Sequence, residues 1–243
     1  MNIMNYTVFT DSLNTLDLNK RQIINTINPH SYVTAKYDKT FHKALSSSDV
    51  LIPDGSGIVL AAKQLHRKSI EKIAGYNLCM FLLNQMHEST GKVFFMGASE
   101  STLIKIKDRL NREYPNITVE YYSPPFKESF SDDDNSEIID KINNFKPDVL
   151  FIGMTAPKQE KWLYEHQDKL DFTIASSIGA VFDFYAEVVR RPSSFWQNLH
   201  LEWFIRLVSE PKRLWKRNFI STPQFLFDIF LFKINLKKTV CDI

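Results

Sequence analysis

The sequence contains few residues that break or cross-link a chain. Only seven of its 243 residues are glycine and ten are proline, too few for a low-complexity or collagen-like protein. Its two cysteines, Cys79 and Cys241, form no C-x-x-C pair and no zinc-ligand spacing with the six histidines. Neither a disulfide framework nor a zinc site is indicated, and we expect the reduced thiols of an intracellular protein.

The sequence also lacks a hydrophobic run long enough to cross a membrane. Its longest uncharged stretch, residues 73–87, holds several polar side chains, and residues 218–232 contain Asp228. A spanning helix needs about 20 apolar residues. Residues 1–10 show neither the basic start nor the apolar core of a signal peptide. We therefore expect no membrane span and no secretion.

Charge is unevenly distributed along the chain. Residues 1–189 carry a net charge of −4, whereas residues 190–243 carry +6 and hold three of the four tryptophans. Basic and aromatic enrichment is typical of a segment that lies on an anionic membrane surface. A packed pair of helices with a solvated basic face explains the composition as well. We expect no nucleic-acid partner, because the body is acidic and no binding motif accompanies the patch.

Apolar runs alternate with amphipathic stretches along most of the chain. The pattern predicts strands at residues 22–27, 50–52, 93–96, 118–122, 149–152 and 173–178. It predicts helices at residues 32–45, 58–65, 99–112, 131–145 and 158–170. Repeated units of this length indicate an α/β fold with a Rossmann-like, mostly parallel sheet and helices on both faces. We assign residues 1–191 to this body and residues 192–243 to a basic, aromatic helical appendage.

Four of the seven glycines lie just past the carboxyl ends of predicted strands. Open α/β sheets bind their ligands at the carboxyl ends of their strands, so we expect the site along that edge. The four glycines are Gly55, Gly97, Gly153 and Gly179.

Residues 53–57 (PDGSG) place a carboxylate on a tight turn between a strand and a helix. Asp54 is a plausible general base there, because small neighbours let a ligand approach and helix N–H groups face an anion. Capping of the following helix explains Asp54 equally well. Thr26 and Asn28 end the preceding strand and can reach the same edge, although an Asn-Pro turn also accounts for them.

Two further strand ends carry candidate ligand groups. Gly97 and Ser99 offer a phosphate cradle, but the remaining glycines of a dinucleotide fingerprint are absent, which argues against an oxidoreductase and favours a helix cap at Ser99. Residues 153–162 begin a helix with Gln159 and Glu160 in its first turn, where a simple solvated turn is the alternative. Asp183 brings a second acid to the same edge.

Asp132, Asp133 and Asp134 contain a D-x-D pattern, which metal-dependent sugar-nucleotide enzymes use to hold a divalent ion. Here the run opens a predicted helix, where acids act as caps and dipole partners. We expect no metal and no other cofactor, and assign no role to the histidines.

Six motifs, in this order, resemble those of the WecG/TagA/CpsF glycosyltransferases (glycosyltransferase family 26) over about residues 20–220. They are Thr26-x-Asn28, the 53–57 turn, Ala74-Gly75, residues 153–162, residues 179–183 and the tail segment 202–213. The resemblance implies a metal-independent, inverting enzyme that moves a sugar from a UDP-sugar to a polyprenyl-diphosphate-linked saccharide. It also implies work at the inner face of the plasma membrane in cell-wall polymer, capsule or exopolysaccharide assembly, with an N-acetylmannosamine-type or related hexose as donor sugar.

The resemblance implies roles for single residues. Asp54 would be the general base, with Thr26 and Asn28 lining the sugar pocket. Lys72 and Asn77 stand where the family usually has arginine and aspartate, and lysine lacks the bidentate fork of arginine. The residues expected to bind substrate or nucleotide are Gly55, Gly57, Lys72, Gly97, Ser99, Gln159, Glu160 and Asp183. Those expected to meet the lipid diphosphate and membrane are Arg206, Arg213, Lys216 and Arg217.

Two properties stay open at this level. A non-catalytic, membrane-peripheral nucleotide-binding scaffold of the same fold would satisfy the same pattern. The sequence leaves the oligomeric state open, and a homo-oligomer is compatible with it.

Overall fold

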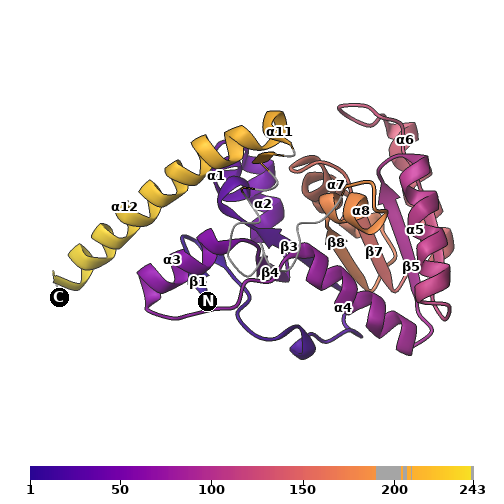
Figure 1. Ribbon diagram of the computed structural model, residues 1–243, viewed down its shortest axis with the longest axis horizontal. Coiled ribbons are helices and arrows are strands. Elements are labelled where there is room, and N and C mark those ends of the chain that lie inside the picture. The colour runs from indigo at the N-terminus through magenta and orange to yellow at the C-terminus, as the bar shows by residue number, and fades with distance from the viewer. Residues whose placement is uncertain (190–203, 205–206, 209, 242–243) are drawn as a thin grey trace.

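A six-stranded parallel sheet forms the centre of the protein, as the sequence predicts. The computed structural model describes residues 1–189, 204, 207–208 and 210–241 (Figure 1). The strand order is β4-β3-β8-β7-β5-β6, and a separate two-stranded antiparallel sheet joins β1 (Asn2–Ile3) and β2 (Tyr6–Thr7). The strands of the main sheet are β3 (Gln22–Ile27), β4 (Val50–Pro53), β5 (Lys92–Gly97), β6 (Thr118–Tyr122), β7 (Val149–Gly153) and β8 (Ile174–Ser177).

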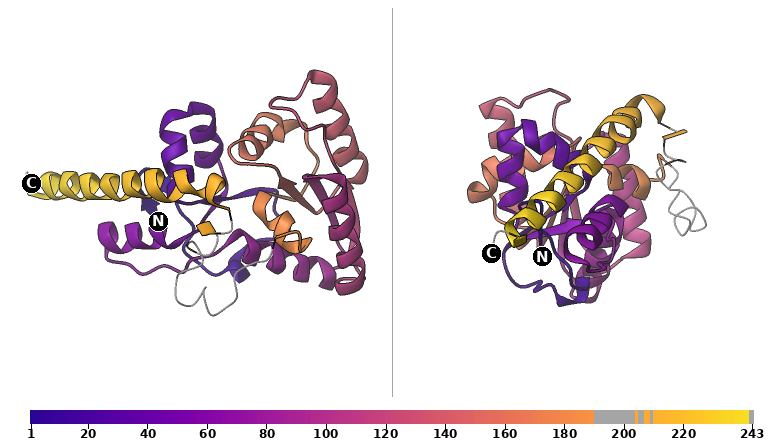
Figure 2. Two further views of the ribbon diagram at one scale, coloured as in Figure 1. Left: turned by 45° about the horizontal axis from the view of Figure 1, so that its top comes forward. Right: turned by 90° about the vertical axis from the view of Figure 1, so that its left-hand side faces the viewer.

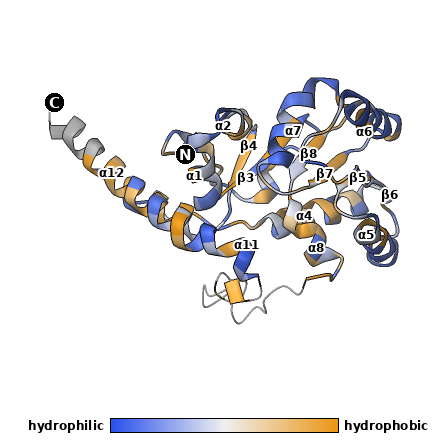
Figure 3. Cartoon of the chain, turned by 90° about the horizontal axis from the view of Figure 1, so that it is seen from above, coloured by the Kyte–Doolittle hydropathy of each residue, from blue (hydrophilic) through white to orange (hydrophobic). Residues whose placement is uncertain are grey.

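Helices cover both faces of this sheet (Figure 3). On one face, α4 (Gly75–Glu88), α5 (Glu100–Glu113) and α8 (Gly179–Tyr185) pack on alternate strand residues such as Phe95 and Phe151. On the other, α6 (Asp132–Phe145) and α7 (Lys158–His166) pack on Phe94 and Leu150. Because both faces are covered, β7 is buried at all five of its residues, which explains its unbroken apolar sequence.

A third core lies at the β4 end of the sheet. It brings together α1 (Pro29–Tyr37), α2 (Lys39–Ser46), α3 (Ser56–His66) and the N-terminal hairpin. Two residues of the C-terminal segment, Phe225 and Ile229, belong to the same cluster and are 0% and 5% exposed. The body and the tail therefore share a hydrophobic core.

Two helical predictions need correction, and one long helix has no counterpart in the prediction. The helix expected over residues 32–45 is two helices, because Asp38 adopts an extended conformation and its carboxylate accepts from Phe41 N–H to begin α2. The helix expected to end at residue 170 leaves α-geometry at His166 and continues as the short 3₁₀ helix η2 (Gln167–Lys169). Helix α4 was not predicted as a helix at all. A further 3₁₀ turn, η1, spans Leu13–Thr15.

Residues 211–241 form three consecutive helical pieces. They are α11 (Pro211–Lys216), the π-helical turn η3 (Arg217–Ser221) and α12 (Thr222–Cys241). The first part of α12 lies against α1 and α3, whereas its far end extends beyond the body (Figures 1 and 2). None of the helices in the described ranges is long and apolar enough to cross a membrane.

Candidate active site at the carboxyl edge of the sheet

The sheet changes winding direction at three neighbouring strand pairs along its carboxyl edge, and the outer two pairs are β3/β8 and β7/β5. The chain leaves β3 toward α1 on one face and leaves the adjacent β8 toward α8 on the other. The chain leaves β5 and β7 toward opposite faces in the same way. Such switch points are where open α/β sheets bind ligands. The residues predicted from the sequence divide between these two positions.

Asp54 lies at the first switch point, on a turn fixed by the neighbouring strand. Its backbone N–H donates to the Ile27 carbonyl at the end of β3, at 2.9 Å. The N-cap of α3 is Gly55, with φ of +99°, a conformation that favours glycine. The N-cap position of α3 is therefore Gly55, and Asp54 directly precedes it. Its side chain is half-buried.

Asn28 stands next to this turn and caps α1. Its Oδ1 accepts from the N–H groups of His30 and Ser31, both at 3.0 Å, and the Ser31 hydroxyl completes a capping box. A methyl group at Gly55 would lie 3.9 Å from Asn28 Cβ, so the two turns are in contact. The capping role commits the amide oxygen, which leaves Nδ2 as the group with which Asn28 can reach a substrate.

Gly57 has a packing role in the same corner. A methyl group at position 57 would lie 2.4 Å from Pro29 Cγ, closer than real carbon atoms approach. Glycine here lets the first turn of α3 pack against the first turn of α1. Gly55 and Gly57 thus let the turn that carries Asp54 lie close to the turn that carries Asn28.

Thr26 meets the start of α4. A methyl group at Gly75 would lie 3.9 Å from Thr26 Cγ2, 3.7 Å from Ile178 and 3.6 Å from Val181. Strand β3, the N-terminus of α4 and the N-terminus of α8 therefore converge at one point. Helix α4 has 14 residues and no side-chain cap at its first turn, so the partial positive charge of its N-terminus faces this point.

Lys72 belongs to the segment that leads into α4. The Ile73 N–H donates to the Pro53 carbonyl at 3.0 Å, which holds this segment against the end of β4, one residue from Asp54. Lys72 is half-buried, and Asn77 is exposed on α4. A cation and a helix N-terminus therefore lie along the same strand end as the candidate base.

Gly97 and Ser99 lie at the second switch point and serve the contact between β5 and β7. Gly97 has φ of +114°, and a methyl group there would lie 2.5 Å from the Gly153 carbonyl oxygen. The same oxygen accepts from Ala98 N–H at 2.9 Å. Ser99 is exposed and caps α5 by accepting from Thr102 N–H at 3.3 Å. The helix-cap alternative for Ser99 is confirmed.

Gln159 and Glu160 point into the protein, so the solvated first turn considered as an alternative is wrong. They are 5% and 4% exposed. Gln159 Oε1 accepts from Met154 N–H at 3.2 Å and from Gly179 N–H at 3.0 Å, and its Nε2 donates to Glu160 Oε1 at 2.9 Å. Burial raises the pKa of Glu160 from 4.5 to about 7. Asp183 lies half-buried on α8, which begins at Gly179.

The tail reaches the first switch point through α1. His30, two residues after Asn28, forms a 2.9 Å hydrogen bond with Ser221 through Nδ1. Burial, with a smaller effect of the Arg217 charge, lowers the pKa of His30. No role for His30 is expected from the sequence, and only its position in the Asn28-Pro29-His30 segment could have suggested one by proximity to Asn28. Lys216 is exposed, Arg206 lies outside the described residues, and the side chain of Arg213 is not described.

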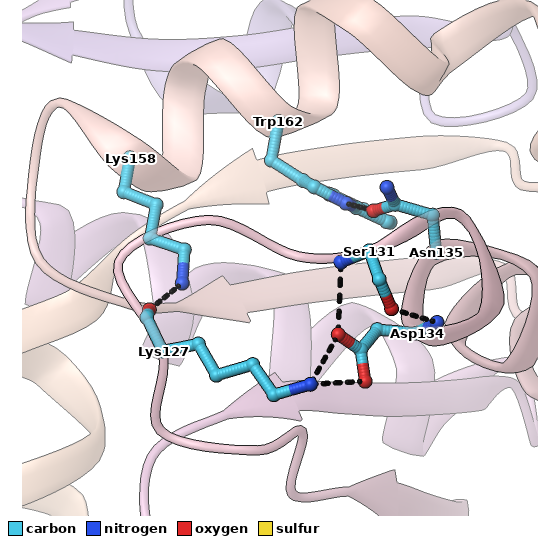
Figure 4. Close-up of polar contacts among 6 residues, drawn as sticks. All are labelled: Lys127, Ser131, Asp134, Asn135, Lys158 and Trp162. Carbon is cyan, nitrogen blue, oxygen red and sulfur yellow. Dashed lines mark hydrogen bonds and ion pairs between the residues drawn. The ribbon is translucent and has the colours of Figure 1, made fainter.

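The acidic run acts as a helix opener. Asp134 accepts from Lys127 Nζ and from Ser131 N–H, and Ser131 Oγ accepts from Asp134 N–H in a capping box (Figure 4). The bond from Lys127 is the main reason why the pKa of Asp134 falls to about 2. Within the described ranges, no group of three or more His, Cys, Asp or Glu side chains could hold a metal ion.

Comparison with known proteins agrees with this arrangement. The model of the glycosyl transferase WecG/TagA/CpsF family matches residues 2–239. An N-acetylglucosaminyldiphosphoundecaprenol N-acetyl-beta-D-mannosaminyltransferase from Bacillus spizizenii is 32% identical, over 90% of this chain and 84% of its own. Enzymes of the same name from Bacillus subtilis and Staphylococcus aureus are 29% and 27% identical, over 96% and 88% of this chain and 89% and 81% of theirs. The chain is therefore a glycosyltransferase that belongs to the WecG/TagA/CpsF family.

Proposed function

We propose that the protein transfers a sugar from a UDP-sugar to a polyprenyl-diphosphate-linked saccharide with inversion at the anomeric carbon. In this reaction an acceptor hydroxyl attacks the anomeric carbon, its proton passes to a carboxylate, and UDP leaves with the electrons of the broken glycosidic bond. The relatives are named for an N-acetylglucosamine-diphosphoundecaprenol acceptor and a transferred N-acetylmannosamine. These names support the same acceptor class and an N-acetylmannosamine-type or related sugar here.

The position of Asp54 is the observation that carries the proposal. A general base must lie within about 2.6 to 3.2 Å of the hydroxyl that it deprotonates, so its backbone must be fixed. The bond from Asp54 N–H to Ile27 and the contact between Gly55 and Asn28 fix it from two sides. Asn28 and Thr26, from the adjacent strand, supply an amide and a hydroxyl with which sugar hydroxyls can pair.

Stabilisation of the leaving diphosphate does not require a metal in this proposal. Lys72 and the uncapped N-terminus of α4 lie along the strand end that carries Asp54. Both favour the developing negative charge, as helix N-termini and cations do in phosphate sites. The D-x-D run is not needed, because Asp134 is committed to Lys127 and Ser131.

The dimensions of the edge suit an elongated donor. Strands β4 and β5 are four strand spacings apart, about 19 Å at 4.8 Å per strand. A single sugar cannot touch both ends of this edge, whereas a nucleotide-sugar can lie along it. We infer that the sugar lies near Asp54 and that the nucleotide extends toward β8, β7 and Asp183.

The tail supports a location at the inner face of the plasma membrane. In addition to the residues that pack on α1 and α3, α12 has large apolar side chains that are exposed. Hydrophobic positions recur along this helix, which follows the basic α11 in the chain (Figure 3). A basic segment with exposed aromatics binds anionic lipid surfaces. The exposed apolar side chains are Leu226, Phe227, Phe230, Leu231 and Ile234.

Replacement of the candidate base tests the proposal. Asp54→Asn keeps the size of the side chain but cannot accept a proton, so we expect kcat to fall by about 10² to 10⁴ with UDP affinity unchanged within a few fold. Asp140→Asn, an exposed change on α6, is the matched control and should behave as wild type.

The assay mixes a panel of UDP-sugars with a polyprenyl-diphosphate N-acetylglucosamine acceptor and measures UDP release and product mass. Near-normal kcat in Asp54→Asn would move the base elsewhere. UDP binding without turnover by the wild type, for any donor in the panel, would instead favour the non-catalytic scaffold.

A further inference from the structure

Gln159 joins two strand ends through a single side-chain oxygen. Its Oε1 accepts from the N–H of Met154, after β7, and from the N–H of Gly179, the first residue of α8. The contact is close, since a methyl group at position 179 would lie 2.1 Å from the Met154 carbonyl oxygen and 2.7 Å from Gln159 Oε1. The amide of Gln159 therefore fixes where α8 begins relative to β7.

Glu160 holds the other end of the same amide. Its Oε1 accepts from Gln159 Nε2 at 2.9 Å, and among the described residues its Oε2 has no hydrogen-bond partner. A carboxyl group that is 4% exposed and has one oxygen without a partner in the described part of the chain is unfavourable, because burial penalises polar groups that are not fully paired. Glutamate at this position thus lowers the stability of the fold compared with an apolar residue of the same volume. We infer that the benefit of glutamate is its hydrogen bond to the Gln159 amide.

Helix α8 transmits the position of Gln159 to the candidate site. Ile178 and Val181, at its start, lie against Gly75 at the N-terminus of α4. Gly75 in turn adjoins Thr26 at the end of β3. Asp183 is carried on the same helix, on the side of the edge where we place the nucleotide. A continuous series of contacts therefore links Glu160 to the groups around the donor.

We propose that Glu160 is a positioning residue for sugar transfer: as acceptor for Gln159 Nε2, it fixes the carboxamide that sets the start of α8 against the donor site. This inference rests on the proposed function. Glu160 is buried away from the substrate and moves no proton in the reaction. Its role requires an acceptor oxygen at this place and does not require a negative charge.

Two variants of Glu160 separate these requirements. Glu160→Gln keeps an acceptor oxygen, so we expect KM for the UDP-sugar and kcat within about threefold of wild type. Glu160→Leu fills the space without an acceptor, so we expect KM for the donor to rise about tenfold, the size of one buried hydrogen bond, while kcat changes less than threefold. Glu165→Leu, at an exposed position of the same helix, is the matched control.

Amide hydrogen exchange tests the positioning step without the enzymatic assay. Exchange at Met154 and Gly179 should accelerate in Glu160→Leu and remain as in wild type in Glu160→Gln. This measurement separates the two proposals. If the wild-type protein transferred no sugar, the proposed function would be refuted. The hydrogen-exchange rates of the variants would still show whether Glu160 positions Gln159.

An exchange of the two side chains provides a second route. Gln159→Glu places two carboxyl groups against each other, whereas Gln159→Glu with Glu160→Gln restores one donor and one acceptor. The double variant should recover the donor KM and the slow amide exchange that Gln159→Glu alone loses. It therefore tests the proposal even if Glu160→Leu does not fold. Loss of kcat in Glu160→Gln, wild-type behaviour of Glu160→Leu, or no recovery in the double variant would each overturn the proposal.

Discussion

Attachment of the tail to the body gives a prediction whose size follows from packing. Phe225 is fully buried, its ring centroid lies 5.2 Å from that of Tyr32 at an interplanar angle of 76°, and it approaches Gly57. Truncation of a fully buried phenylalanine to alanine costs about 3 to 5 kcal/mol. Phe225→Ala should therefore lower the free energy of unfolding by that amount and Tm by roughly 6 to 20 °C.

The same helix supplies the control. Phe227 is 59% exposed, and Phe227→Ala should change the free energy of unfolding by about 0.5 kcal/mol or less. Both values come from urea unfolding followed by circular dichroism. Equal, small effects of the two substitutions would refute the docking of α12. A large effect of Phe225→Ala alone would mean that α12 contributes to the stability of the body.

Three further predictions concern pH, metal and membranes. Because burial raises the pKa of Glu160 from 4.5 to about 7, its contribution to stability is fully present below pH 4.5 and is lost as the pH rises to 7, by about 3 kcal/mol. The wild-type protein should thus lose that much more stability than Glu160→Gln between pH 4.5 and pH 8 in urea unfolding, and parallel curves would contradict the assignment. Sugar transfer should survive excess EDTA, whereas inhibition that Mg²⁺ or Mn²⁺ reverses would reinstate the acidic run at Asp132. The protein should co-sediment with anionic vesicles in a salt-sensitive way, at about 1 kcal/mol per basic residue near the surface, and Phe227→Ser with Phe230→Ser should weaken this binding without unfolding the protein.

The arrangement of strands could be predicted because local signals and tertiary structure agree. Strands β3 and β6 span residues 22–27 and 118–122 in both the prediction and the structure, and the other four strands differ by one residue at one or both ends. Four of the strands end within two residues of a glycine, and parallel strands share a carboxyl edge, so the expected location of the candidate site followed from the sequence.

Two helical regions were predicted incorrectly, for different reasons. The break between α1 and α2 depends on a contact with a residue far away in the sequence, and the residues of α4 were considered only as a possible membrane span. The carboxylate of Asp38 forms an ion pair of 2.9 Å with Lys161, 123 residues away, at the break between α1 and α2. Residues 73–87 were assessed only as a membrane span, although their buried side chains recur at the spacing of a helix. Those side chains are Leu78, Cys79, Leu82, Leu83 and Met86.

The inward direction of Gln159 and Glu160 could not be read from the sequence. Polar residues in the first turn of a helix are normally solvated, and nothing local distinguishes this turn. The donors that Gln159 satisfies come from Met154 and Gly179, which follow two different strands. Only the assembled sheet brings those N–H groups together, so the sequence predicts Gln159 as a substrate- or nucleotide-binding residue but does not predict its contacts with Met154 and Gly179.

Helix α1 connects the candidate site to the tail. Its first turn begins at Asn28, packs against α3 through Gly57 and bonds to Ser221 through His30. Further along, Lys36 forms a 2.8 Å ion pair with Asp228 of α12, which is 8% exposed. A force that displaces α12 therefore acts on the helix that Asn28 caps. In the proposed reaction, the lipid-linked acceptor must come from a membrane surface. Helix α1 would then connect α12, which would rest on that surface, to Asn28, which would line the sugar pocket.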